Sequence, residues 1–235
     1  SDYNSSIKYR FLVANHPSIN AFATPGGVIV INSGLIQKTK TEAELASVMA
    51  HEIAHVKARH LSRMHEESSK VNITTALSVL ATVIAGTYST GALGKTLVTT
   101  QSVKASKLTN FIREHEVEAD RLAINILVAA NINPNAMSEF FKTLQKENND
   151  SGALEFLRTH PLTQNRITET QNLASRYKGQ FTNDSFAYQF TSARVSIERL
   201  NTRAFISSYT YNSKLLETNP GRIVDDYAYG LALGK

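Results

Sequence analysis

His51-Glu52-Ile53-Ala54-His55 is the stretch that decides how the remainder of this chain is interpreted. In a helix, residues four apart lie on one face about one turn apart, so His51 and His55 can bind the same metal ion. Zn²⁺ accepts imidazole nitrogens at roughly 2.0–2.1 Å. Glu52 lies about 100° around the helix, where it can take a proton from water at the metal. These five residues therefore predict a zinc site with its own general base.

The residues around this pentapeptide are typical of an amphipathic helix. Thr41 is a candidate N-cap, and Glu44 three residues later completes a capping box. Glu42 and Glu44 stand in the first turn, where the helix dipole favours carboxylates. Apolar residues recur at helical spacing along the segment, namely Leu45, Val48, Met49, Ile53 and Val56. A pair of surface histidines on such a helix is the alternative that this motif alone leaves open.

A carboxylate that can complete the metal site follows about sixty residues later. Glu116 and Asp120 stand four apart, so they share one face of a second predicted helix. Glu116 as third ligand leaves the fourth position to water, which is the arrangement of catalytic zinc. Asp120 is placed to accept the outer N–H of a ligand histidine. His115 is the competing ligand, although it points about 100° away from Glu116. Glu114 and Glu118 are interpreted as ordinary solvated charges.

Further stretches complete a pattern of four motifs in a fixed order. Residues 20–35 read NAFATPGGVIVINSGL, Arg113 precedes Glu116, and residues 159–162 read THPL ahead of Arg166. With the two helices above, the chain resembles the gluzincin metalloendopeptidases of the HtpX and CAAX-prenyl-protease family over roughly residues 7–177. The resemblance implies a zincin-like α+β core that is predominantly helical, with a small β-sheet. Within this family, the chain looks most similar to soluble bacterial periplasmic enzymes with a C-terminal tetratricopeptide (TPR) array.

The resemblance also gives two residues candidate catalytic roles. A lone histidine before proline is more often structural, but His160 belongs to the family's His-Pro loop. It is expected either to stabilise the tetrahedral oxyanion or to cap the open zinc position and keep the enzyme latent. Arg166 is expected to stabilise the oxyanion or to bind a peptide carboxylate. A structural Arg–Asp pair is an equal alternative for Arg166.

A small sheet packed on the zinc helix is predicted from alternating apolar residues in 7–13 and 28–32. Zincins commonly hold extended substrate along an edge strand by β-augmentation, and residues 27–32 form the candidate strand. The glycines before it would let another backbone come close. The predicted substrate-binding residues are Gly27, Val28, Ile29 and Val30. A structural hairpin without substrate contact is the alternative.

Residues 71–94 contain no charged side chain. A membrane span needs about 20 predominantly apolar residues, and this segment is too rich in Thr, Ser and Gly for a convincing one. A buried helix hairpin is therefore the first interpretation. A hairpin that contacts a membrane surface or a partner is the second, and a true span is the third.

Composition argues against several other classes of protein. The net charge is +5, and Lys and Arg are scattered without the aromatic-interleaved stripe of a nucleic-acid interface. The absence of cysteine excludes disulfides and a thiol nucleophile, and no Gly-x-Ser-x-Gly elbow is present. A metzincin would need Gly at the position of Ala58 and His at that of Leu61, and His60 is one residue out of phase.

Two domains are predicted, a protease domain over residues 1–178 and a helical segment over residues 179–235. Residues 227–232 read YAYGLA and look like the first helix of a TPR unit. Such units normally stack in threes or more, so a chain that ends inside one is expected to be part of a longer protein. A helical cap on the protease, without further repeats, is the alternative.

The combined expectation is a zinc-dependent metalloendopeptidase that holds one Zn²⁺ by His51, His55 and Glu116, with Glu52 as general base. The resemblance implies a role in envelope quality control in the bacterial periplasm. The expected substrates are unfolded or misassembled outer-membrane proteins, and a barrel-assembly machine is an expected partner. The alternative is a largely latent protease that acts as a chaperone or adaptor through its TPR helices.

Overall fold

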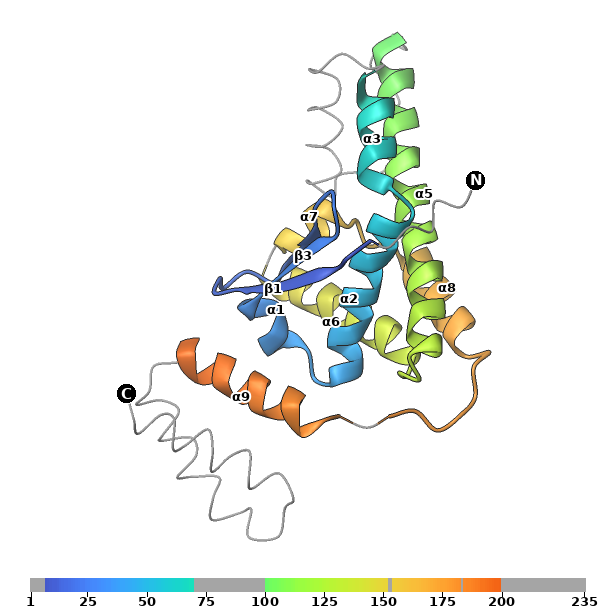
Figure 1. Cartoon of the computed structure of the whole chain (residues 1–235). Helices are drawn as coiled ribbons and strands as arrows, with labels where there is room; N and C mark the ends of the chain where they lie inside the picture. The colour runs from blue at the N-terminus through green and yellow to red at the C-terminus, as the bar shows by residue number, and fades with distance from the viewer. Residues whose placement is uncertain (1–6, 70–99, 152–153, 183, 200–235) are drawn as a thin grey trace, which may run out of the picture.

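The computed structural model describes residues 7–69, 100–151, 154–182 and 184–199 (Figure 1). The strands are β1 (Arg10–Ala14), β2 (Ala21–Ala23) and β3 (Val28–Asn32). The helices are α1 (Ser33–Lys38), α2 (Glu42–Lys57), α3 (His60–Ser69), α5 (Thr100–Ala129), α6 (Asn135–Ser151), α7 (Glu155–Thr159), α8 (Gln164–Ala174) and α9 (Phe186–Arg199). This mostly helical arrangement with one small sheet confirms the α+β class.

Two regions singled out in the sequence lie outside the described residues. They are residues 71–94, the uncharged segment, and residues 200–235, where further TPR helices were expected. None of the described helices combines the length and the apolar character that crossing a membrane requires.

Helix α2, which carries the pentapeptide, begins where the sequence predicts. Thr41 Oγ1 accepts the backbone N–H of Glu44 at 3.1 Å, which confirms Thr41 as the N-cap. The Glu44 carboxylate departs from the expected capping box, because it accepts the N–H of Lys40 at 2.6 Å instead of that of the N-cap residue. The first contact pairs an amide that the helix start would otherwise leave without a partner, and the second holds the residue just before the N-cap. Helix α2 then packs against α5, α6 and β2.

The sheet has the order β1-β3-β2, with β3 in the centre. Strand β1 runs parallel to β3 in a register that pairs Arg10 with Val28, and β2 runs antiparallel to it with Phe22 opposite Val30. Gly26 and Gly27 make the turn from β2 into β3 with φ of 92° and 85°, a left-handed conformation that glycine adopts without strain.

The prediction that residues 27–30 form the substrate-binding edge strand is wrong. Val28, Ile29 and Val30 belong to the central strand, which is hydrogen-bonded to β1 on one side and to β2 on the other. A strand paired on both sides has no N–H and C=O groups left for a peptide to join by β-augmentation. The outer edges of this sheet are those of β1 and β2.

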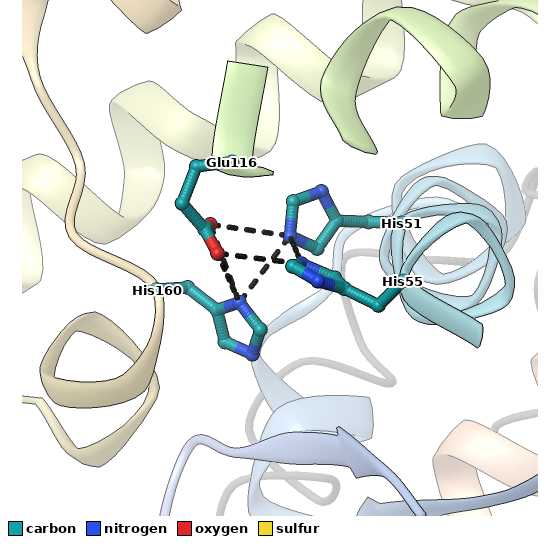
Figure 2. A group of neighbouring side chains, drawn as sticks. All are labelled: His51, His55, Glu116 and His160. Carbon is teal, nitrogen blue, oxygen red and sulfur yellow. Dashed lines mark hydrogen bonds and ion pairs between the residues drawn. The ribbon is translucent and has the colours of Figure 1, made fainter. Parts of the chain in front are cut away.

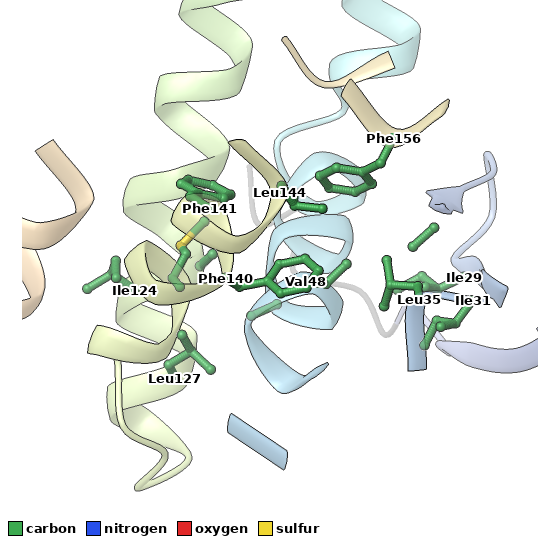
Figure 3. Packing of buried hydrophobic residues seen from close by; sticks show 14 of the residues in the cluster. Ile29, Ile31, Leu35, Val48, Ile124, Leu127, Phe140, Phe141, Leu144 and Phe156 are labelled. Carbon is green, nitrogen blue, oxygen red and sulfur yellow. The ribbon is translucent and has the colours of Figure 1, made fainter. Parts of the chain in front are cut away.

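The hydrophobic core joins the sheet to the helices that carry the pentapeptide and the Glu116 motif (Figure 3). Its members come from β2, β3, α1, α2, α5, α6, α7 and α8 and include Ile29, Ile31, Leu35, Val48, Ile124, Leu127, Phe140, Leu144 and Phe156. Burial of one such side chain contributes roughly 1.5–3 kcal/mol. This packing fixes α2 against α5 and thereby sets the distance between the two motifs.

Helix α9, which follows the predicted domain boundary at residue 178, packs on the preceding helices. The Tyr188 hydroxyl donates to the Thr39 carbonyl at 3.1 Å, and Gln37 Nε2 donates to the Val195 carbonyl at 3.3 Å. The N–H of Glu42 donates to the Asp184 carboxylate at 2.7 Å. The first helix of the C-terminal segment is therefore attached to α1 and to the start of α2. The boundary itself stays a prediction.

Candidate metal centre

Two histidines and a carboxylate from two helices converge on one point in the interior (Figure 2). His51 and His55 come from successive turns of α2, and Glu116 comes from α5. The two histidine Nε2 atoms are 2.9 Å apart. Glu116 Oε2 lies 3.4 Å from His51 Nε2, and Glu116 Oε1 lies 3.3 Å from His55 Nε2. The structure thus brings the three predicted ligands together, and the competing candidate His115 is outside the group.

These separations fit a tetrahedral ion. Two ligand atoms that each lie 2.0–2.1 Å from a tetrahedral centre are about 3.3–3.4 Å apart. The two distances to Glu116, 3.4 and 3.3 Å, agree with this value, and the 2.9 Å between the two histidine Nε2 atoms is shorter. Imidazole nitrogen and carboxylate oxygen are also donors that bind divalent transition metals well. The residues present therefore fit a divalent metal ion.

His160 lies beside the three converging side chains, at the C-cap of α7 (Figure 2). Its Nδ1 is 3.3 Å from His51 Nε2 and 3.3 Å from each carboxylate oxygen of Glu116. One donor atom from each of His51, His55, Glu116 and His160 lies within 4.8 Å of the others. Its other ring nitrogen, Nε2, is 3.3 Å from Glu52 Oε1. His160 therefore lies where a fourth ligand or a cap would lie, which is one of the two roles that the sequence left open.

A buried ion pair between Asp120 and Arg166 contacts two of the candidate ligands, His51 and Glu116. Asp120 Oδ1 lies 3.0 Å from His51 Nδ1, the outer nitrogen of a candidate ligand. Arg166 donates from Nε and Nη2 to the two oxygens of Asp120 at 2.7 and 2.8 Å. Its Nη1 donates to the Pro161 carbonyl at 2.7 Å and is 2.9 Å from Glu116 Oε2. All three guanidinium nitrogens are thus engaged within the protein, as in the structural Arg–Asp alternative.

Glu52 is almost fully buried and does not belong to the converging donors. Burial raises the pKa of its carboxyl group to about 7, although the nearby His51 and His55 lower it. A carboxyl group with a pKa near 7 can both accept and return a proton at neutral pH. The position and pKa of Glu52 suit a general base.

The ligand candidates His51 and Glu116 and the neighbouring Asp120 all have shifted pKa values. Burial disfavours a charged His51, but contacts with Asp120 and Glu116 outweigh it and raise the pKa of His51 to about 9. Burial also disfavours ionised Glu116, but His160 and Arg166 hold its pKa well below the ordinary value. Asp120 keeps a lowered pKa in spite of burial, mainly because of Arg166. In the metal-free chain the two ionised carboxylates are therefore balanced by Arg166 and a protonated His51, and a metal ion would bind in place of the His51 proton.

His60 lies next to His55 and is itself in contact with Glu118 and His115, an arrangement that the sequence did not predict. His60 Nδ1 is 2.9 Å from His55 Nδ1, and His60 Nε2 is 3.2 Å from Glu118 Oε2. The His115 ring stacks on His60, with centroids 4.1 Å apart and planes 8° apart. Burial lowers the pKa of both His60 and His115 to about 4, so both rings are neutral at pH 7.

A break between α2 and α3 brings His60 to His55. Residues five apart in a continuous helix point about 140° apart and do not face each other. Helix α2 ends at Lys57, and Arg59 takes a left-handed φ of 55° before α3 begins at His60. Glycine or asparagine is the usual sequence sign of such a left-handed helix end, and arginine gives no such sign.

A cavity of about 230 Å³ lies beside the cluster. Its walls are formed by Phe22, Ala23, Glu52, His55, His60, Leu61, Met64, Ile112, His115, Glu116, Arg158, Thr159 and His160. Side chains from β2, α3 and α5 make much of this wall apolar, while Glu52 and Glu116 contribute carboxylates. The predicted strand residues 27–30 are not among the described residues that line it. The cavity gives a substrate access to both the cluster and the candidate base.

Comparison with known proteins agrees with this site. The sequence pattern of peptidase family M48 matches residues 3–174. A beta-barrel assembly-enhancing protease of Yersinia pestis is 36% identical over 188 residues, which are 80% of this chain and 39% of that protein. The protein of the same name from Escherichia coli (strain K12) is 33% identical over 194 residues, 81% of this chain and 40% of that protein. Mitochondrial metalloendopeptidase OMA1 of Schizosaccharomyces pombe is 31% identical over 169 residues, 71% and 47% of the two chains.

The match of the family pattern covers nearly the same residues as the resemblance seen in the sequence, and it includes both helices of the candidate metal centre. The chain spans about 40% of the length of the beta-barrel assembly-enhancing proteases that it matches. With the family pattern matching well over half of its residues, the chain belongs to peptidase family M48.

Proposed function

We propose that this chain is the catalytic part of a zinc metalloendopeptidase, with His51, His55 and Glu116 as the metal ligands. The observation that carries the proposal is the convergence of their three donor atoms at separations of 2.9 to 3.4 Å beside the buried Glu52. Among divalent ions, zinc suits a site of two imidazoles and one carboxylate.

Each residue of the site has a separate role in peptide-bond hydrolysis. Bound zinc supplies a Lewis acid that polarises the scissile carbonyl and makes water more acidic. Glu52 takes the proton of the attacking water and then delivers it to the leaving amine, which its pKa of about 7 allows. Asp120 orients His51 through its Nδ1, and Arg166 holds Asp120 in place. The apolar wall of the cavity excludes bulk water from the reacting groups.

An extended substrate is expected to lie along β2 instead of β3. Phe22 and Ala23 of β2 line the cavity next to Glu52, and β2 pairs with β3 on one side only among the described residues. A peptide that adds to the outer edge of this strand would bring a peptide bond to the cluster.

The biological role follows from the relatives. Those of Yersinia pestis and Escherichia coli are named for enhancing β-barrel assembly. By analogy, the whole protein would degrade unfolded or misassembled outer-membrane proteins in the bacterial periplasm, with the barrel-assembly machinery as partner. A TPR array that follows the protease core would supply the binding surface for these partners.

We expect the chain to bind one zinc ion and to cleave an unfolded protein such as casein only when zinc is bound. Removal of zinc with 1,10-phenanthroline should abolish cleavage, and addition of one equivalent of zinc should restore it. The measurements are zinc content by atomic emission and initial rates of fragment release. A chain that cleaves casein equally well without metal would contradict the proposal.

A second candidate function is a largely latent protease that acts mainly as a chaperone or adaptor. The position of His160 favours it, because His160 Nδ1 lies 3.3 Å from both His51 Nε2 and Glu116. A site with four protein ligands is closed, whereas a catalytic zinc site keeps one position for water. In this state the chain would bind unfolded proteins and cleave them slowly.

Replacement of His160 by alanine is expected to raise casein turnover several-fold and to weaken zinc binding, because it removes a group that competes with water. The measurements are initial rates and zinc affinity of the variant beside wild type. His65→Ala, at an exposed position of α3, serves as the matched control. Turnover that falls while zinc affinity stays unchanged would argue instead that His160 stabilises the oxyanion.

A further inference from the structure

The two candidate ligand histidines differ in what holds their outer nitrogen. His51 Nδ1 faces the carboxylate of Asp120 at 3.0 Å, a common outer partner of a ligand imidazole. His55 Nδ1 instead lies 2.9 Å from Nδ1 of another ring, that of His60. In a contact between two neutral imidazole nitrogens, one carries the proton and donates, and the other is bare and accepts.

The carboxylate of Glu118 decides the direction of this contact. It lies 3.2 Å from His60 Nε2 and accepts from Arg63 Nη1 at 2.9 Å. An ionised carboxylate only accepts, so His60 Nε2 carries the proton and His60 Nδ1 is bare. His55 Nδ1 must then donate to His60 Nδ1. This leaves His55 Nε2 with the lone pair that faces His51 and Glu116.

His60 is itself firmly held. Its ring is 2% exposed and stacks on the His115 ring, which in turn packs against Phe111 at a centroid distance of 4.1 Å. The left-handed Arg59 between α2 and α3 sets the direction from which His60 reaches His55. A non-glycine residue keeps this strained conformation only where its surroundings impose it.

We propose that His60, oriented by Glu118, is a positioning residue that fixes the tautomer and orientation of His55 for metal binding. Each ligand histidine then has an acceptor next to its outer nitrogen, Nδ1. Asp120 contacts His51 directly, whereas Glu118 acts on His55 through the imidazole of His60. The inference rests on the proposed metal site and adds to it a residue that touches neither metal nor substrate.

The test measures the zinc affinity of the chain by competition with a chelator, without reference to activity. His60→Phe keeps an aromatic ring for stacking on His115 but removes both ring nitrogens. We expect its zinc affinity to fall about tenfold or more. His65→Phe, at an exposed position of the same helix, is the matched control and should bind zinc as wild type does.

Two variants at Glu118 test the same relay at a half-exposed position, where folding is little affected. Glu118→Ala should weaken zinc binding several-fold, whereas Glu118→Gln keeps an acceptor oxygen for His60 and should be close to wild type. If His60→Phe fails to fold, the two Glu118 variants alone test the proposal. Equal zinc affinity for Glu118→Ala and wild type would then overturn the proposal.

The tautomer of His55 provides a readout that a purely structural role would not change. Long-range ¹H–¹⁵N spectra of the metal-free chain should show the Nδ1–H form of His55 in wild type and a mixture of forms in His60→Phe. Unchanged zinc affinity together with an unchanged tautomer in His60→Phe would overturn the role of His60 alone. Failure of wild type to bind zinc would overturn the metal site and this inference together.

Discussion

Replacement of Glu52 by glutamine is expected to lower kcat for casein cleavage by about 10²–10⁴-fold while zinc remains bound. Glutamine has nearly the shape of glutamate but cannot accept a proton from water at neutral pH. Glu52 is also outside the group of converging donors, so its loss leaves the three candidate ligands in place. Initial rates and zinc content, measured on the same preparations, check both parts of the expectation.

Glu114→Gln is a matched control for this experiment. Glu114 is exposed on α5, two residues before Glu116, so its replacement removes one negative charge near the site without touching the cavity. It should leave kcat within about twofold of wild type, as for surface charges in general. A Glu52→Gln variant with more than a tenth of wild-type kcat would show that another group acts as base. Loss of zinc from this variant would instead make Glu52 a part of the metal site.

The parts of the site that depend on helix periodicity could be predicted from the sequence. His51 and His55 share a helix face because they are four residues apart, and Glu116 and Asp120 share a face of α5 for the same reason. The meeting of the two faces depends on long-range packing of α2 against α5. The sequence indicated that meeting only through the order of the motifs in the family that it resembles.

The parts that depend on strand order or on a change of chain direction could not be predicted. Alternation identified the residues of β3 correctly, but the same pattern fits a central and an edge strand, so its role at a substrate edge was wrong. His60 was considered only as an out-of-phase ligand, because the left-handed Arg59 that turns it toward His55 has no sequence sign. The role of Arg166 was left open because the sequence does not show which carboxylate it meets.

Replacement of Arg166 by methionine is expected to lower the free energy of unfolding by about 3–5 kcal/mol. Arg166 is 3% exposed, and its guanidinium is the permanent cation in contact with both Asp120 and Glu116. Methionine retains much of the packing on Phe141, over whose ring the guanidinium carbon lies at 5.0 Å from the centroid. The loss would therefore come mainly from two buried carboxylates without their partner. Urea unfolding of the metal-free chain, followed by circular dichroism, measures it.

Arg121→Met is the matched control because it breaks an ion pair between the same two helices at the surface. Arg121 of α5 pairs with Glu169 of α8, and its side chain is 59% exposed. Water solvates both charges when the pair is broken, so the expected loss is below about 1 kcal/mol. A loss for Arg166→Met as small as that of the control would mean that Asp120 and Glu116 remain stable without the guanidinium. The stability of the fold would then not account for the burial of Arg166. A contact with the substrate or with its oxyanion would explain that burial better.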